Sequence, residues 1–310
     1  LDEQTTTHWH GGIVPGDADG GVHNIIQPNT KWTANFPVIQ QAATLWYHPH
    51  QHEETARQVY KGLGGMIIID DQNSQNLNLP NNYGVDDVPI ILQSKDLDKN
   101  GRLVDVVHTN HHLMTDGYIG NTLLTNAQIA PMLNVTTNLI RLRILNASHG
   151  EIYNLSFTGD IPFSIIASDG GFYNEPITKT RVEIAPANRY EIILDVSSLK
   201  GKKINLLENK KRVALTLNIQ DGLEEKYELP KSLNALVAPD SPSNIDRTFT
   251  METNMGMGGM MRGMGTSGGS RHNNSSGIVT INGQSFDMNR IDFAAKNGNV
   301  EYWEVKNLGG

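Results

Sequence analysis

Two short histidine motifs are the part of this sequence with the clearest capacity for chemistry. They are His8-Trp9-His10, followed by Gly11, and His48-Pro49-His50. Each motif ends a run of residues that is typical of a β-strand, and residues two apart on a strand project from the same face. Each motif therefore directs two imidazoles to one side.

Four imidazoles without a thiolate or carboxylate beside them limit the kind of metal. Neutral imidazole binds copper, zinc, nickel or iron, whereas calcium and magnesium prefer oxygen ligands. The chain contains no cysteine, which excludes disulfides, zinc-thiolate sites and cysteine nucleophiles. Copper is favoured, and zinc remains open on these grounds. Chance pairing on a surface strand explains one such motif more easily than two motifs with aromatic neighbours.

The elements that must position these motifs are short strands. Apolar residues alternate or run over short stretches with turn signals between them, and sustained helical periodicity is rare. Around the motifs we predict strands at residues 5–10, 31–37, 44–50 and 65–70. Many short strands without strong helices favour an antiparallel sandwich or barrel. The fold class is therefore expected to be all-β.

Changes in composition divide the chain into four regions. With 310 residues, 38% of them hydrophobic, the chain can bury one large core or two ordinary ones. The expected regions are a partial first domain with both histidine motifs (1–75), a second domain (84–222), a linker with a Met-rich segment (223–276) and the start of a truncated third domain (277–310).

Several classes of function find no support. The net charge is −8 and basic residues are scattered, so no nucleic-acid partner is expected. The apolar runs fall far short of the roughly 20 residues of a membrane-spanning helix. Nucleotide-binding and serine-nucleophile motifs are absent from the sequence. Residues 1–7 lack a charged leader and an apolar core, so we expect no signal peptide here, and the lack of a starting Met suggests a missing upstream segment.

A series of longer strings carries a resemblance to a known family. The strings run from Thr7 to Gly11, Trp46 to His52, Leu142 to Asn146, Ile166 to Gly171 and Ile281 to Met288. In this order they resemble the motifs of multicopper oxidases, particularly the bacterial copper-efflux oxidase and laccase branch. The resemblance covers nearly the whole chain and is more specific than either histidine motif alone.

The resemblance implies three cupredoxin-like Greek-key β-sandwich domains. These hold a mononuclear copper that accepts electrons and a trinuclear copper cluster that reduces dioxygen to water. By this resemblance His8 would bind the type 2 copper, His10 and His48 would share one type 3 copper, and His50 would bind the other. Asp19 matches an acidic residue that assists proton delivery, although it also suits a plain turn in Gly-Asp-Ala-Asp-Gly-Gly.

The departures from the family pattern matter as much as the matches. The other four cluster histidines and the type 1 copper ligands belong to two later motifs that this sequence lacks. The chain alone is therefore expected to be inactive, and the intact protein to be the enzyme. Its expected partners are dioxygen and either cuprous ion or a small phenolic substrate. Relatives usually act outside the cytoplasm, but the compartment is left open.

The methionines between Met251 and Met264 resemble an insert that recruits cuprous ion in copper-efflux oxidases. Thioethers do favour Cu(I), although a flexible linker is an equally good explanation. His108, His111 and His112 are expected to be exposed residues of a loop. The remaining histidines match no ligand position of the family and are left out of the site: His23, His52, His149 and His272.

Two other interpretations stay open. One is a copper-free cupredoxin-fold protein with a structural or binding role, although such relatives lose their ligand histidines. The other is a zinc-binding β-sandwich of unrelated function. The main interpretation requires His8 and His48 to lie within about 10 Å, because metal–nitrogen distances are near 2 Å. A parallel sheet with crossover helices would contradict it.

Overall fold

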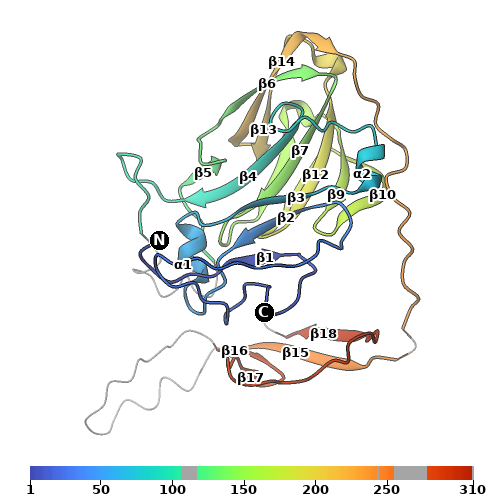
Figure 1. The fold of residues 1–310 in the computed structure, drawn as a ribbon. Coiled ribbons are helices and arrows are strands. Elements are labelled where there is room, and N and C mark those ends of the chain that lie inside the picture. Colours follow the sequence, from blue (N-terminus) through green and yellow to red (C-terminus); the bar gives the residue numbers. More distant parts are fainter. Residues whose placement is uncertain (106–116, 243, 255–277, 309–310) are drawn as a thin grey trace. The chain divides into compact units, whose positions relative to one another are not determined.

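The computed structural model describes residues 1–105, 117–242, 244–254 and 278–308 (Figure 1). It divides into two compact units, one up to residue 236 and the other from residue 237 onward. Within the described residues nearly every regular element is a strand, and most neighbouring strands are antiparallel. The predicted all-β class is confirmed.

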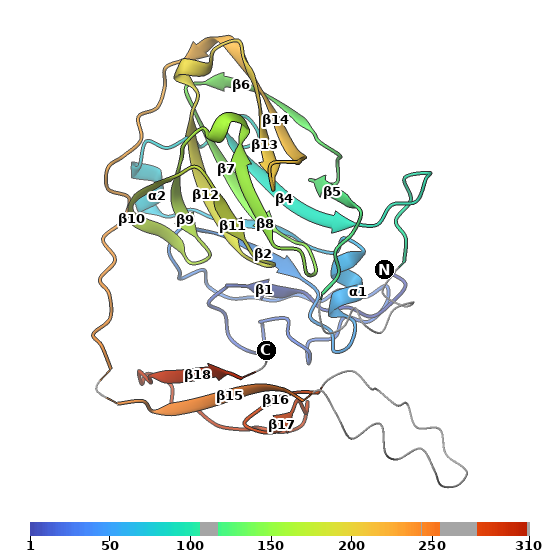
Figure 2. The same cartoon turned by 180° about the vertical axis from the view of Figure 1, so that it is seen from behind.

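The body of the first unit is a sandwich of two sheets (Figures 1 and 2). The larger sheet has the order β10-β9-β12-β7-β4-β5 and the smaller one the order β11-β8-β13-β14-β6. The larger sheet contains β4 (Asp87–Lys95), β5 (Thr122–Thr125), β7 (Leu139–Asn146), β9 (Phe163–Ser168), β10 (Gly171–Lys179) and β12 (Arg189–Asp195). The smaller sheet contains β6 (Met132–Thr137), β8 (Tyr153–Phe157), β11 (Val182–Ile184), β13 (Lys203–Glu208) and β14 (Arg212–Glu224).

Strand β7 shows how this sandwich is built. Ile140, Leu142 and Ile144 point into the core between the two sheets and are fully buried. The alternate residues of β7 are buried as well, because its other face is also covered. Two of these alternate residues are arginines, Arg141 and Arg143, so the second buried face of β7 is partly charged.

The outer face of the larger sheet is covered by a third, smaller sheet. It consists of β1 (His8–His10), β2 (Ala43–His48) and β3 (Gly65–Ile69) in the antiparallel order β1-β2-β3. Trp46 of β2 packs against Leu145 and Ala147 at the end of β7. Both histidine motifs therefore lie on a sheet that is supported from behind by the sandwich.

A buried ion network joins β2 to the larger sheet. The guanidinium of Arg143 donates to both carboxylate oxygens of Asp87, at 2.7 and 2.8 Å, and its Nη1 donates to Glu191 and Thr44, each at 2.9 Å. Arg141 also pairs with Glu191. Burial alone would raise the pKa of Glu191, but Arg141 and Arg143 hold it below its ordinary value. Two buried cations thus balance two buried anions.

Short helices and one irregular segment depart from the predicted strands. α1 (Thr55–Tyr60) follows the second histidine motif, and α2 (Gln72–Asn76), capped by Asp71, follows the predicted strand 65–70. Residues 31–37 form no strand. Their side chains do alternate between exposed and half-buried, but among the described residues no strand pairs with them. Alternation indicates an extended backbone, whereas a strand also needs a hydrogen-bonded neighbour.

The second unit contains one sheet with the order β17-β16-β15-β18. Its strands are β15 (Arg247–Asn254), β16 (Ile278–Ile281), β17 (Gln284–Ser285) and β18 (Trp303–Asn307). β15 lies inside the stretch predicted to be a linker (223–276), so that prediction is wrong for these residues. The prediction rested on the Pro, Ser and Gly content of the whole stretch. It therefore missed the strand that the short alternating run Arg247-Thr248-Phe249 indicates.

Other parts of the predicted linker belong to the first unit or lie outside the described residues. Tyr227 and Leu233 are buried in an apolar cluster with Phe172. Met251 on β15 is exposed, while the other methionines of the Met-rich segment lie outside the described residues. Among the described helices, none has the length and apolar character needed to cross a membrane.

Candidate metal centre

The pairing of β1 with β2 brings the two histidine motifs together. The antiparallel register places His8 opposite His48 and His10 opposite Trp46. The ring centroids of His8 and His48 lie 5.4 Å apart, so the predicted proximity is confirmed. Residues two apart share a face, and His8, His10 and His48 therefore converge on the same side of the sheet.

Three of the four histidines form a compact set of nitrogen donors. His10 Nδ1 and His48 Nε2 are separated by 3.1 Å, and potential ligand atoms of His8, His10 and His48 all lie within 4.8 Å of one another. The His50 ring lies 5.2 Å from that of His8 and 5.9 Å from that of His48. The structure thus brings all four predicted histidines together.

His50 was predicted to end the strand at residues 44–50, but it lies outside the strand in the structure. Strand β2 ends at His48, because Pro49 has no backbone N–H to continue the ladder. His50 is exposed, and its backbone N–H donates to Thr6 Oγ1 at 2.6 Å. It therefore lies just beyond the strand rather than at its end.

Backbone carbonyls orient two of the rings. His8 Nδ1 lies 3.0 Å from the carbonyl oxygen of Asp19, and His48 Nδ1 lies 2.8 Å from that of Pro49. A carbonyl can only accept, so the proton of each neutral ring belongs on Nδ1. This leaves Nε2 of His8 and His48 unprotonated, which is the usual arrangement around metal-binding histidines, and in this structure Nε2 of His48 is hydrogen-bonded to His10 Nδ1.

The surroundings also keep two of the rings, those of His10 and His48, neutral. Burial lowers the pKa of His10 to about 4, and the charge of Arg189 lowers it further in the same direction. Burial likewise lowers the pKa of His48 to about 4, although its hydrogen bond to Pro49 acts in the opposite direction. Both rings are uncharged at neutral pH, and the neutral form is the one that donates a lone pair to a metal.

The donor geometry fits a copper ion. Two nitrogen atoms that bind one ion at about 2.0–2.1 Å can lie no more than about 4 Å apart, and the 3.1 Å between His10 Nδ1 and His48 Nε2 satisfies this limit. The donors are imidazoles, which suit copper and zinc. The donor set alone does not separate these two metals.

Aromatic packing holds the strands in place around the donors. The Trp46 ring lies 4.2 Å from the ring of His48 and 5.4 Å from that of His10. On the opposite face of β1, Trp9 stacks with Trp32 at 6.4 Å. The contacts with Trp46 limit the rotamers of His10 and His48, which favours a preformed site.

Asp19, the predicted proton-delivering residue, lies beside His8. Its Oδ1 is 3.2 Å from His8 Nδ1, and its side chain is 37% exposed. The loop is tied to β1 because Trp9 Nε1 donates to the Ala18 carbonyl at 2.9 Å. Gly20 has a φ of +73°, and a Cβ there would lie 1.6 Å from the Thr7 carbonyl oxygen. Only glycine allows this close approach.

A cavity of about 400 Å³ opens in front of the four histidines. Residues of α1 line it, and so do three residues from the loops that follow β7 and precede β12: Ser148, His149 and Ala187. His149 was not among the predicted site residues, because it matches no ligand position of the family. Of the remaining histidines, His23 is exposed, and His108, His111, His112 and His272 lie outside the described residues.

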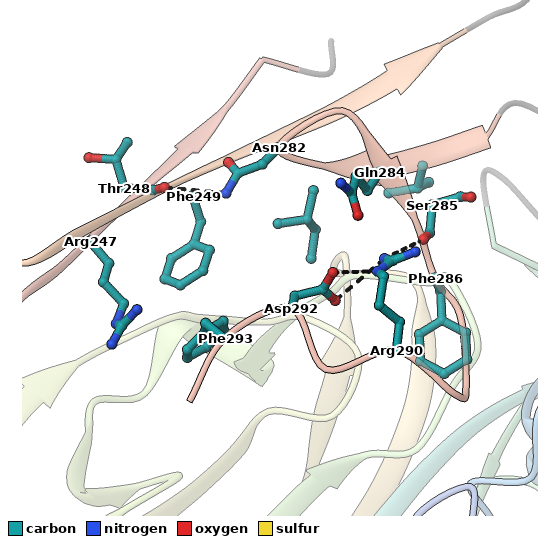
Figure 3. A pocket seen from close by; sticks show the side chains of 12 residues that line it. Arg247, Thr248, Phe249, Asn282, Gln284, Ser285, Phe286, Arg290, Asp292 and Phe293 are labelled. Carbon is teal, nitrogen blue, oxygen red and sulfur yellow. Dashed lines mark hydrogen bonds and ion pairs between the residues drawn. The ribbon is translucent and has the colours of Figure 1, made fainter. Parts of the chain in front are cut away.

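The second unit contains a larger hollow of about 650 Å³ with a different character (Figure 3). The rings of Phe249 and Phe293, 5.2 Å apart, lie on one side of it, and the ion pair of Arg290 and Asp292 lies on another. Its lining includes no histidine among the described residues. Its lining combines aromatic and aliphatic side chains with one ion pair, and we do not assign it to the metal centre.

The fold and site together define a cupredoxin-like protein with a histidine-rich candidate metal centre, and comparisons support this class. The multicopper oxidase family model matches residues 1–74. The chain is 37% identical to the multicopper oxidase mco of Staphylococcus haemolyticus, over 99% of this chain and 60% of the relative. It is 34% identical to the cell division protein FtsP of Escherichia coli, over 94% of this chain and 60% of that protein.

A solved structure supports the same assignment. The laccase-like multicopper oxidase CueO of Ochrobactrum sp. superimposes with a TM-score of 0.80 at 30% identity, covering 99% of this chain and 68% of that one. The chain belongs to the multicopper oxidase family, and the predicted cupredoxin-like fold is confirmed. It spans about 60% of the length of the curated relatives it matches.

Proposed function

We propose that the intact protein couples the one-electron oxidation of cuprous ion or small phenol-like donors to the four-electron reduction of dioxygen to water. The observation that carries this proposal is the convergence of His10 and His48, from two different strands, to a nitrogen–nitrogen distance of 3.1 Å. Family membership supports copper over zinc as the metal. The CueO of Ochrobactrum sp. has oxidase activity towards lignin model compounds, which supports a phenol-like donor.

In this proposal each histidine of the chain has a distinct role. His8 holds the type 2 copper, His10 and His48 hold one type 3 copper, and His50 holds the other. Bound copper supplies one-electron redox chemistry, and several ions together supply the four electrons that dioxygen requires. The protein orients His8 and His48 through the Asp19 and Pro49 carbonyls, and burial keeps His10 and His48 neutral.

The domain division predicted from sequence remains part of the proposal. Residues 1–75 and 84–222 would be cupredoxin domains, and residues 277–310 would begin a third. The four other cluster histidines and the type 1 copper ligands would come from further parts of the intact protein. The single sheet in the described part of the second unit supports this, because a β-sandwich needs a second layer.

The direct test is oxygen uptake by the intact, copper-loaded protein. We expect uptake with cuprous ion, with a phenol, or with both, and no accumulation of hydrogen peroxide. A His10→Ala variant should lose the uptake, whereas His23→Ala, a change at an exposed histidine outside the cavity, should retain it. Absence of uptake with every donor, in protein that holds copper, would contradict the proposal.

The role proposed for Asp19 gives a second test. Its carboxylate contacts both His8 and solvent, so it can carry protons to the site. We expect Asp19→Asn to lower the steady-state rate of oxygen uptake by about 100-fold, a typical contribution of general acid–base catalysis, with copper content unchanged. Asp17→Asn, an exposed carboxylate of the same loop, is the matched control. Equal rates for Asp19→Asn and Asp17→Asn would mean that Asp19 only forms the turn and does not deliver protons.

The likeness to FtsP favours one alternative. A 34% identical relative is named as a cell division protein, so a structural or binding role without copper is the second candidate. The four converging histidines argue against it, because a protein without copper has no need to maintain them. An intact protein that binds no copper would favour this alternative.

A further inference from the structure

Of the four histidines at the candidate metal centre, His50 is the one that the pairing of β1 with β2 does not hold. His8, His10 and His48 lie on the paired strands, whereas β2 ends at His48 and His50 follows Pro49. His50 is also exposed, so little packing restrains it. Its position therefore depends on the hydrogen bond from its backbone N–H to the hydroxyl of Thr6.

The peptide group between Pro49 and His50 connects Thr6 to two of the histidines. Its N–H donates to Thr6 Oγ1 at 2.6 Å, and its C=O, the Pro49 carbonyl, accepts from His48 Nδ1 at 2.8 Å. The group is planar and trans, so its N–H and C=O point in opposite directions and rotate together. A rotation that weakens one hydrogen bond therefore weakens the other. Thr6 acts on the ring of His48 as well as on the backbone of His50.

The segment that carries Thr6 is held in place by its own hydrogen bonds. Thr5 exchanges two backbone hydrogen bonds with Ile26, at 3.1 and 2.8 Å. The Thr5 hydroxyl donates to Gln58 Oε1 at 2.8 Å, and Gln58 Nε2 donates to the Gln4 carbonyl at 2.7 Å. Gln58 belongs to α1 and is fully buried, and Thr6 is 2% exposed. These contacts fix the segment, and with it the acceptor oxygen of Thr6, against α1.

We infer that Thr6 is a positioning residue of the metal centre. Its hydroxyl fixes the Pro49–His50 peptide, and this peptide holds both the backbone of His50 and the orientation of the His48 ring. The inference rests on the proposed function, in which His48 and His50 bind different copper ions. Thr6 acts through these two histidines and is not itself a ligand.

The first test compares the intact, metal-free protein with its Thr6→Val variant, which keeps the branched shape and removes the hydroxyl. Hydrogen exchange at the His50 amide should become about fivefold faster, the factor that corresponds to one ordinary hydrogen bond. A nitrogen-15 spectrum should show His48 protonated at Nδ1 in the wild type and as a mixture of tautomers in the variant. Thr6→Ser restores the hydroxyl and should return both signals to the wild-type values. Thr7→Val, at the neighbouring half-buried threonine, is the matched control and should change neither.

The second test titrates the intact, copper-loaded protein with a chelator and measures the copper that stays bound. Loss of a group that orients metal ligands costs about 10–100-fold in metal affinity. The Kd of the most weakly held copper should therefore rise at least about tenfold in Thr6→Val. In Thr6→Ser and Thr7→Val it should stay within about threefold of the wild-type value.

Three outcomes overturn the inference. The first is a His50 exchange rate and a His48 tautomer that do not change in Thr6→Val, and the second is a wild-type copper Kd in that variant. The third is a fall in the Tm of metal-free Thr6→Val that Thr6→Ser does not restore, because Thr6 would then act through packing alone. A wild-type protein that binds no copper would contradict the proposed function, and the metal-free measurements would still decide whether Thr6 fixes the peptide.

Discussion

Replacing Arg143 with methionine is expected to lower the free energy of unfolding of the intact protein by about 3–5 kcal/mol. Arg143 is 2% exposed and contacts Asp87, Glu191 and Thr44. Methionine leaves the buried Asp87 carboxylate without its bidentate partner, and an uncompensated buried charge is costly. Urea unfolding, monitored by tryptophan fluorescence, gives the change directly.

Two further variants test whether the loss of stability comes from the buried ion network or from the loss of any arginine. Arg181→Met alters an exposed arginine and should change stability by less than about 0.5 kcal/mol. The double change Arg143→Met with Asp87→Asn removes both charges of the pair and should recover part of the loss. A loss below about 1 kcal/mol for Arg143→Met alone would mean that the network contributes little to stability.

Replacing His48 with alanine is expected to remove at least one copper ion per molecule and to lower oxygen uptake by on the order of 100-fold or more. Changes to residues that merely support metal ligands cost 10–100-fold, and loss of a ligand should cost at least as much. His48 is the central donor of the group, since its Nε2 lies 3.1 Å from His10 Nδ1. Elemental analysis and oxygen uptake measure the two effects.

The variants of His48 need a control for folding, because its ring is 7% exposed and packs against Trp46. His48→Gln fills more of this space and should show the same copper loss with a smaller change in Tm. His23→Ala should keep wild-type copper content. Full copper content in His48→Ala and His48→Gln would exclude His48 as a ligand.

The local pattern of the sequence was sufficient for most strands near the motifs and for the shared face of His8 and His10. Alternation within the first histidine motif predicts that His8 and His10 share a face, and the structure confirms this. The register that sets His8 opposite His48 was not predictable from the motifs alone, because it depends on pairing across about 40 residues. The resemblance to multicopper oxidases supplied that part of the prediction.

Features that depend on tertiary contacts were not predictable from local pattern. Residues 31–37 alternate like a strand, yet no described strand pairs with them. His149 joins the cavity only because the loop after β7 packs against Gly117 and Tyr118. The position of Arg189 near His10 likewise depends on how β2 lies on the larger sheet, where Arg189 Nε donates to the Thr44 carbonyl at 3.0 Å.

The measurement that tests the central claim most directly is anomalous X-ray diffraction from crystals of the intact protein at the copper absorption edge. We predict copper peaks about 2.0–2.1 Å from nitrogen atoms of His8, His10, His48 and His50. Peaks that appear at the zinc edge instead would assign a different metal and remove the basis for oxygen reduction. An absence of any metal peak beside these four histidines, in crystals grown with copper, would contradict the claim that they form a copper centre.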